Sequence, residues 1–135
     1  STAPEKIGQG LKKAGPFLIE FIEDTKKRFS LNDNNIIFFG FSQGAMMALH
    51  HLCKREKECG GVLSYSGLLY ENDNFENEIK SRFPIKIFHG KNDEVIDAEY
   101  SMKAFERLKK LGFDIEVKLQ DGLGHGIDEN GLNYG

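Results

Sequence analysis

One stretch of the chain decides the fold: Ile36-Ile37-Phe38-Phe39-Gly40-Phe41-Ser42-Gln43-Gly44-Ala45. The run over 36–39 is a continuous series of apolar β-branched and aromatic residues, which is typical of a parallel-sheet strand covered on both faces. A helical pattern begins at Gln43, directly after Ser42. A Gly-x-Ser-x-Gly segment between a strand and a helix is the setting of a nucleophile elbow, a sharp turn that holds a serine hydroxyl at the carboxyl end of a sheet.

Glycine is expected at both positions that flank this turn, Gly40 and Gly44, because a side chain at either would collide with the neighbouring strand or helix. The helix N-terminus also leaves backbone N–H groups without partners, and the Gln43 amide is the one expected to donate to an oxyanion beside Ser42. The alternative is that the two glycines merely allow tight packing of the strand on the helix.

A serine hydroxyl is a poor nucleophile at neutral pH, so it needs a base. The chain has four histidines. His50 and His51 fall on the helix after the elbow and cannot face back over its N-terminus, so surface or packing roles are expected for them. His89 ends a strand and is expected to bond locally to a turn. His125 lies in the glycine-rich loop 122–126 after the last strand, from which its ring can reach the carboxyl edge of the sheet, and we predict that it is the base.

The base in turn needs an acceptor that orients it, and Asp93 lies in the loop after the strand that ends at position 89. Asp97 competes, but its place before a helix suits a helix cap better. Asp121 and Asp128 flank His125 too closely in sequence to hold its far nitrogen easily. The resulting order of serine, aspartate and histidine along the chain is the one that the α/β-hydrolase fold uses.

The remaining pattern alternates helices and strands, which implies an α/β layered fold with a mostly parallel sheet and helices on both faces. The expected elements are a helix over 4–29 kinked at positions 15–16, a strand over 36–39, a helix over 43–56, a strand over 62–65, a loop over 66–82 with one turn of helix, a strand over 84–89, a helix over 98–111 and a strand over 113–119. Strict alternation of apolar and polar residues in the last strand predicts an outlying position with one wet face.

Composition excludes several classes of protein. A net charge of −3 over 135 residues gives no general attraction to nucleic acid or anionic lipid. The longest apolar run is far below the ~20 residues that stable membrane insertion needs. The N-terminus lacks a signal-peptide pattern, so a cytoplasmic location is expected. Cys53 and Cys59 match no zinc motif and are expected to be reduced, and we predict neither a metal nor a cofactor.

Three blocks of the sequence closely resemble the signature blocks of the phospholipase/carboxylesterase family, to which the acyl-protein thioesterases belong. They are Gly40-Phe41-Ser42-Gln43-Gly44-Ala45, Phe88-His89-Gly90-Lys91-Asn92-Asp93-Glu94-Val95-Ile96 and Gly122-Leu123-Gly124-His125-Gly126-Ile127. The resemblance runs along nearly the whole chain. It implies an α/β-hydrolase fold with Ser42 as nucleophile, Asp93 as acid and His125 as base.

The same resemblance assigns part of an acyl pocket to the loop after the second strand, which here contains Leu68 and Leu69. Met46 and Met47 are further candidates for lining that pocket, although methionines on a helix more often pack in the core. Dienelactone-hydrolase-like enzymes are a less suitable match, because they use cysteine where Ser42 stands.

Two features of the family have no counterpart in the sequence. Family members begin with several strands and a histidine-glycine oxyanion loop, and they end with a helix that packs on the sheet. Residues 1–135 are therefore expected to be a partial α/β-hydrolase domain that lacks the N-terminal strands and the C-terminal helix.

Two functions remain open. The first is a serine hydrolase that cleaves carboxylic esters or thioesters through an acyl-enzyme, slow as an isolated chain because a second oxyanion donor is lacking. The second is a non-catalytic fragment that acts as an interaction or structural module. In both cases the edge of the strand over 36–39 is open to pairing with another chain, including a second copy.

Overall fold

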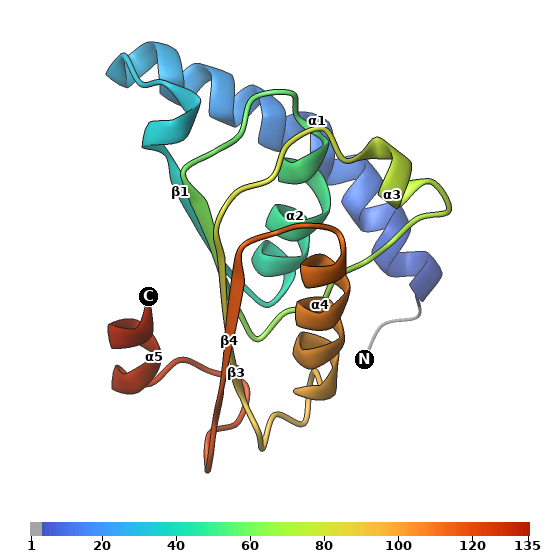
Figure 1. The fold of residues 1–135 in the computed structure, drawn as a ribbon, viewed down its shortest axis with the longest axis vertical. Helices are drawn as coiled ribbons and strands as arrows, with labels where there is room; N and C mark the ends of the chain where they lie inside the picture. Colours follow the sequence, from blue (N-terminus) through green and yellow to red (C-terminus); the bar gives the residue numbers. More distant parts are fainter. Residues whose placement is uncertain (1–3) are drawn as a thin grey trace.

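The computed structural model describes residues 4–135, and its centre is a single sheet of four parallel strands (Figure 1). The strands lie side by side in chain order: β1 (Ile37–Phe41), β2 (Gly61–Tyr65), β3 (Ile85–Gly90) and β4 (Ile115–Gln120). Because all four run in the same direction, their carboxyl ends meet at one edge of the sheet, and the loops that follow them share that edge.

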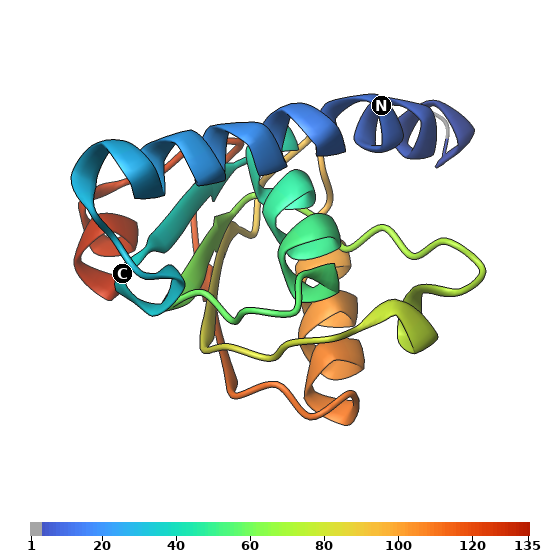
Figure 2. The same cartoon turned by 90° about the horizontal axis from the view of Figure 1, so that it is seen from above.

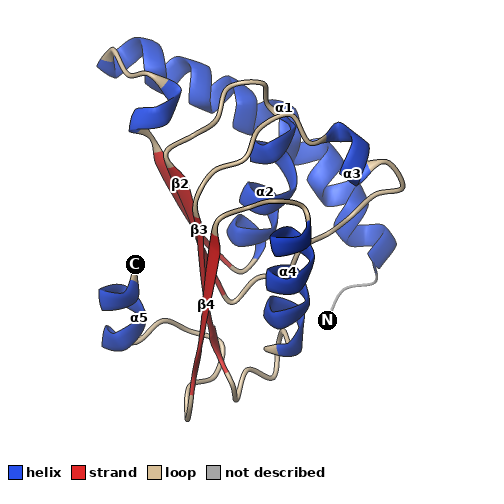
Figure 3. Cartoon of the chain, viewed as in Figure 1, coloured by secondary structure: helices blue, strands red, loops and turns tan. Residues whose placement is uncertain are grey.

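Helices cover both faces of this sheet, as the alternating pattern predicts. They are α1 (Pro4–Phe29), α2 (Gln43–His51), the short α3 (Phe75–Glu78), α4 (Glu99–Lys110) and α5 (Glu129–Tyr134). Figures 1 and 3 show α2 and α4 on one side of the sheet and α5 on the other. In Figure 2 the long α1 runs across the top of the molecule, and it packs against α2.

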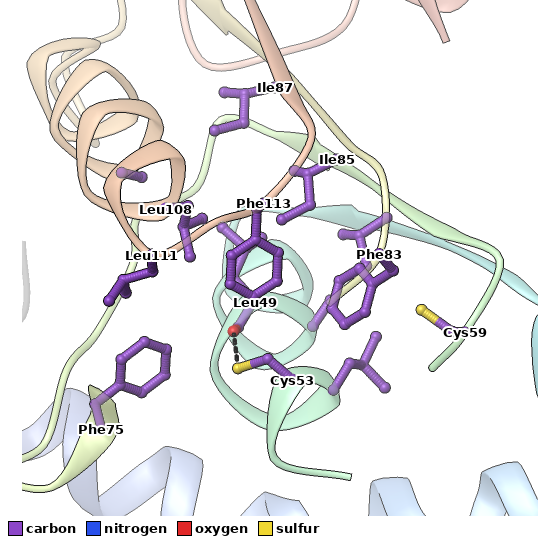
Figure 4. Close-up of a cluster of buried hydrophobic side chains, with 14 of the residues drawn as sticks. Leu49, Cys53, Cys59, Phe75, Phe83, Ile85, Ile87, Leu108, Leu111 and Phe113 are labelled. Atoms are coloured by element: carbon purple, nitrogen blue, oxygen red, sulfur yellow. Dashed lines mark hydrogen bonds between the residues drawn. The ribbon is translucent and has the colours of Figure 1, made fainter. Parts of the chain in front are cut away.

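The main core lies between the sheet and the α2–α4 layer (Figure 4). Aliphatic and aromatic side chains from both layers fill it, among them Leu49, Leu52, Ile85, Ile87, Leu108 and Phe113. Both cysteines are buried there as free thiols, and the Cys53 thiol donates a hydrogen bond to the Leu49 carbonyl. Burial raises the pKa of Cys53 to about 11, so this thiol stays protonated and unreactive at neutral pH.

The observed elements differ from the expected ones mainly at their ends. α1 is one helix with Pro16 inside it, over the same residues as the predicted helix 4–29. α2 ends at His51 and continues as a 3₁₀ turn over Leu52–Lys54, so it is shorter than the predicted helix over 43–56. β1 extends to Phe41, two residues beyond the predicted strand. No helix within residues 4–135 combines the length and the apolar character that crossing a membrane requires.

The prediction that β1 is covered on both faces is wrong for the described residues. Phe38 points to the core, but Ile37 and Phe39 on the other face are 64% and 53% exposed. A continuous apolar run is expected in a strand that has other elements packed on both of its faces. Residues 4–135 place helices over only one face of this strand. β1 is therefore an edge strand with an open apolar face.

The expected lack of a C-terminal helix is also wrong, because a short helix does form there. Asp128 begins α5 and accepts a hydrogen bond from the Gly131 amide at 2.9 Å, which is an N-cap. The Tyr65 hydroxyl donates to the Gly131 carbonyl at 2.9 Å, and this bond fixes α5 on the second face of the sheet. A side chain at Gly131 would meet the Phe88 ring at 2.8 Å, so glycine allows this close approach.

Candidate active site

Ser42 sits in a strained turn between β1 and α2. Its φ of 56° and ψ of −114° lie in a region that non-glycine residues rarely adopt, at a cost of about 1–3 kcal/mol. Two backbone hydrogen bonds hold it there. The Ser42 amide donates to the Tyr65 carbonyl at 2.9 Å, and the Met46 amide donates to the Ser42 carbonyl at 3.1 Å. The side chain is half-buried at the carboxyl end of the sheet.

The two glycines of the turn have different surroundings. A Cβ at Gly40 would lie 2.6 Å from backbone atoms of Gly44 and Ala45, so no side chain fits there. A Cβ at Gly44 would meet nothing within 4 Å, because this residue is on the exposed side of the first turn of α2. The expected collision is therefore confirmed at Gly40 and wrong at Gly44.

His125 links Ser42 to Asp93 across the carboxyl edge of the sheet. Its Nε2 lies 3.1 Å from Ser42 Oγ, and its Nδ1 lies 2.6 Å from Asp93 Oδ2. Because an ionised carboxylate can only accept, Nδ1 donates to Asp93 and Nε2 is left to accept from the Ser42 hydroxyl. The His125 side chain is 19% exposed, and the ring of Phe41 packs against it with centroids 4.9 Å apart.

Asp93 is buried, and both of its carboxylate oxygens accept hydrogen bonds. Its second oxygen, Oδ1, accepts from the amides of Val95 at 2.9 Å and Ile96 at 2.8 Å. Burial acts to raise the pKa of Asp93, but the hydrogen bonds from His125 and from the two amides outweigh it and hold the pKa below its usual value. The carboxylate is therefore ionised at neutral pH.

The other acidic candidates have separate roles. Asp97 accepts from the Glu99 amide at 2.8 Å at the start of α4, where a helix cap was expected. Asp121 pairs with Lys91 at 2.9 Å on the surface, and Asp128 caps α5. Within residues 4–135, none of the three forms a hydrogen bond or an ion pair with His125.

The remaining histidines have packing or local roles, as their positions predict. His50 donates through Nδ1 to the Tyr70 carbonyl at 2.8 Å, and His51 bonds through Nε2 to the Leu11 carbonyl at 2.7 Å. His89 is buried directly under Asp93. No group of three or more side chains able to bind a metal ion occurs among residues 4–135.

Gln43 is the first residue of α2, so its amide has no acceptor inside the helix. This amide adjoins Ser42 at the positive end of the α2 dipole. It is thus placed in sequence and in the fold to donate to a negative oxygen beside Ser42.

An apolar cavity of about 770 Å³ opens beside Ser42. The sequence-predicted Leu68 and Leu69 line it, and Met46 and Met47 line another side. Sequence reasoning missed the wall that α1 supplies through Ile7 and Leu11. A helical stripe looks the same whether it faces a core or a cavity, so no signal in the sequence separates the two.

The site therefore combines a serine hydroxyl, an imidazole, a buried carboxylate and a backbone donor beside an apolar cavity. Proton transfer from the hydroxyl to His125 would generate an alkoxide nucleophile, and the buried carboxylate would stabilise the resulting imidazolium. These are the groups that acyl transfer requires.

Comparison with known proteins gives consistent matches. The family model described as Phospholipase/Carboxylesterase matches residues 1–134. Acyl-protein thioesterase 1 of Candida albicans is 31% identical over 134 residues, which cover 91% of this chain and 56% of that protein. The crystal structure of esterase PE8 superposes with a TM-score of 0.95 at 31% identity, over 99% of this chain and 62% of that one.

The chain spans about half the length of the curated relatives it matches. One of these relatives, from Oryza sativa subsp. japonica, is named "Probable inactive carboxylesterase"; it is 27% identical over 106 residues, which cover 76% of this chain and 43% of that protein.

Proposed function

Because the chain belongs to the phospholipase/carboxylesterase family, we propose that it is the triad-bearing part of a serine hydrolase acting on carboxylic esters or thioesters. The observation that carries the proposal is the continuous contact from Ser42 Oγ to His125 Nε2 at 3.1 Å and from His125 Nδ1 to Asp93 Oδ2 at 2.6 Å. The chain needs no cofactor for this chemistry, since every proton-transfer group is a side chain.

The reaction runs through an acyl-enzyme. Ser42 Oγ bonds to the substrate carbonyl carbon while its proton passes to His125 Nε2, and the carbonyl oxygen becomes an oxyanion beside the Gln43 amide. The imidazolium then gives its proton to the departing alkoxide or thiolate as the bond to the leaving group breaks. A water molecule repeats the sequence at the acyl carbon, which releases the acid and restores the Ser42 hydroxyl. Asp93 stabilises the imidazolium in both halves.

The acyl chain of the substrate occupies the apolar cavity beside Ser42. Leu68 and Leu69 form one wall, and the volume of about 770 Å³ accommodates a flexible hydrocarbon chain. A lysophospholipid, a carboxylic ester and an acylated protein each present such a chain, so this cavity supports all three substrate types.

Residues 4–135 supply one identified oxyanion donor, the Gln43 amide. Loss of one such donor costs on the order of 10²–10³ in rate. We therefore expect the 135-residue chain to hydrolyse p-nitrophenyl acetate far more slowly than a complete esterase does. Hydrolysis at the full rate of an intact esterase would contradict this expectation.

A fluorophosphonate probe tests the proposal directly, because it reacts covalently with an activated serine. The wild-type chain should be labelled at Ser42, and Ser42→Ala should abolish labelling. Asp93→Asn should slow labelling by about 10³–10⁴-fold, because the amide no longer holds the correct imidazole tautomer. Asp97→Asn is the matched control, since it alters a nearby carboxylate that accepts from the Glu99 amide, and it should label like the wild type.

The second candidate is a non-catalytic interaction module, and the open apolar face of β1 favours it. The unpaired edge of β1 then pairs with another chain, including a second copy in a homo-oligomer. A well-folded wild-type sample that takes up no fluorophosphonate would support this candidate and would sink the hydrolase proposal.

A cytoplasmic location is part of the same proposal. Both cysteines are buried free thiols, which suits a reducing compartment in which thiols are kept reduced. Cell fractionation with an antibody against the chain tests the location, and recovery in a secreted fraction would contradict it.

A further inference from the structure

His89 lies at the end of β3, and its side chain is completely buried. Its Nε2 lies 2.7 Å from the Ile96 carbonyl oxygen and 3.1 Å from Asp93 Oδ2. Its Nδ1 lies 2.6 Å from the Ser101 hydroxyl on α4. One ring therefore joins the third strand, the loop that carries Asp93 and the helix that follows this loop.

These partners determine which nitrogen of His89 carries the proton. Two groups that can only accept, the Ile96 carbonyl and the Asp93 carboxylate, face Nε2, so Nε2 must carry the N–H. A neutral ring then accepts at Nδ1 from the Ser101 hydroxyl at 2.6 Å. The other acceptor within reach of that hydroxyl, the Gly67 carbonyl, is more distant at 3.5 Å. The neutral Nε2–H tautomer satisfies every polar atom of the ring.

Ile96 is the point through which His89 acts on Asp93. The Ile96 amide donates to Asp93 Oδ1 at 2.8 Å, while the Ile96 carbonyl accepts from His89. His89 thus fixes Ile96, which in turn fixes Asp93. The Nε2–H of His89 also lies 3.1 Å from Asp93 Oδ2, the oxygen that contacts His125. Without this ring, the Ile96 carbonyl would be a buried acceptor with no partner, an unfavourable state that movement of the loop would relieve.

We propose that His89 is a positioning residue that, locked as the Nε2–H tautomer, sets the orientation of Asp93 towards His125. The proposal rests on the proposed function, in which Ser42 is the nucleophile. His89 does not touch the reacting atoms, so it acts on the reaction through Asp93 alone. An apolar side chain of the same volume could not orient Asp93 in this way, because it has neither the Nε2–H donor nor the Nδ1 acceptor.

Three variants separate positioning from packing. His89→Leu keeps much of the volume and removes the N–H, and it should slow fluorophosphonate labelling of Ser42 by about 10–100-fold. His89→Gln keeps an N–H donor near the Nε2 position and should recover most of that loss. Asp33→Asn weakens a partly buried ion pair with Lys26 at the opposite end of the sheet, and it should lower stability without changing the labelling rate.

A double-mutant cycle adds a readout that simple destabilisation would not produce. If His89 acts through Asp93, His89→Leu should slow labelling very little when Asp93 is already Asn. A full multiplicative loss in the double variant would overturn the proposal.

Nitrogen-15 NMR of the histidine rings tests the proposal even if Ser42 does not react. The wild-type spectrum should show a proton on Nε2 of His89, and the ring signals of His125, which contacts Asp93, should shift in His89→Leu. A His89 ring that carries its single proton on Nδ1, or unchanged His125 ring signals in a folded His89→Leu variant, would refute the role of His89. Absence of labelling in the wild type would instead refute the proposed function, so the two failures are distinguishable.

Discussion

At the scale of single residues, the geometry of Ser42 is set by glycine neighbours that have no reactive side chain. Gly40 lets the backbone of α2 approach β1 closely, and Gly67 lies against Ala45 from the other side. Ser42 itself has a positive φ of 56°, which a serine in the unfolded chain would rarely adopt. The strain persists because tight backbone contacts on both sides leave the residue no alternative.

The two glycines that flank Ser42 should respond differently to alanine. Gly40→Ala places a Cβ 2.6 Å from backbone atoms that cannot move aside, so we expect the free energy of unfolding to fall by about 1–3 kcal/mol. Gly44→Ala meets nothing within 4 Å and improves helix propensity, so it should raise stability by up to about 1 kcal/mol. Urea unfolding monitored by circular dichroism measures both. Equal stabilities of the two variants would mean that Gly40 is not tightly enclosed.

At the scale of elements, α2 holds both walls of the apolar cavity through consecutive histidines. His50 bonds to the carbonyl of Tyr70 in the loop after β2, and His51 bonds to the carbonyl of Leu11 on α1. Tyr70 and Leu11 both line the cavity. The width of the cavity therefore depends on two imidazoles, a buried one at His50 and a half-buried one at His51, and the pKa of each is lowered in the folded chain.

These imidazoles predict a pH dependence of stability. Burial, helped by the nearby Lys54 charge, lowers the pKa of His50 to about 4, and burial also lowers the pKa of His51. Below pH ~6.5 the unfolded chain binds a proton at His50 that the folded chain does not, so the free energy of unfolding decreases as the pH is lowered. From pH 7 to 5 the loss from His50 should be about 2 kcal/mol. Urea unfolding at both pH values measures it.

The variant His50→Gln serves as the control for this pH effect. It removes the titrating group, so its stability should differ between pH 7 and 5 by far less than that of the wild type. The lowered pKa values of Asp33 and Asp93 do not interfere, because stability from depressed carboxyl groups is lost only as the pH falls below their unfolded value of ~3.8. An unchanged pH dependence in the variant would show that His50 is not the responsible group.

At the scale of the whole molecule, features encoded in short stretches of sequence could be predicted, whereas features that depend on which distant segments pack together could not. Ser42, Asp93 and His125 could be predicted to lie together because each sits in a short motif at the carboxyl end of a strand. The order and direction of the strands follow from alternating helix and strand patterns. The wall that α1 gives to the cavity could not be predicted, since Leu11 has the same spacing as core residues.

The open face of β1 is the clearest case of missing information. An apolar strand indicates that both faces can be covered, but it carries no record of what covers them. In the described chain Ile37 and Phe39 remain exposed, and the side chains of Phe17 and Phe21 on α1 are exposed as well. Large apolar surface next to an unpaired strand edge favours association with another chain.

We therefore expect the isolated chain to self-associate through β1, and Ile37→Lys should weaken this association. The residue is 64% exposed on the open face of the edge strand, where a lysine opposes association because its charge would be buried against the apolar surface of the other chain. Leu132→Lys is the matched control, since Leu132 is 61% exposed but lies on α5. Sedimentation velocity over a range of concentrations should show the wild type and Leu132→Lys as oligomers and Ile37→Lys shifted towards the monomer. A wild-type chain that stays monomeric at every concentration would mean that the open face of β1 does not drive association.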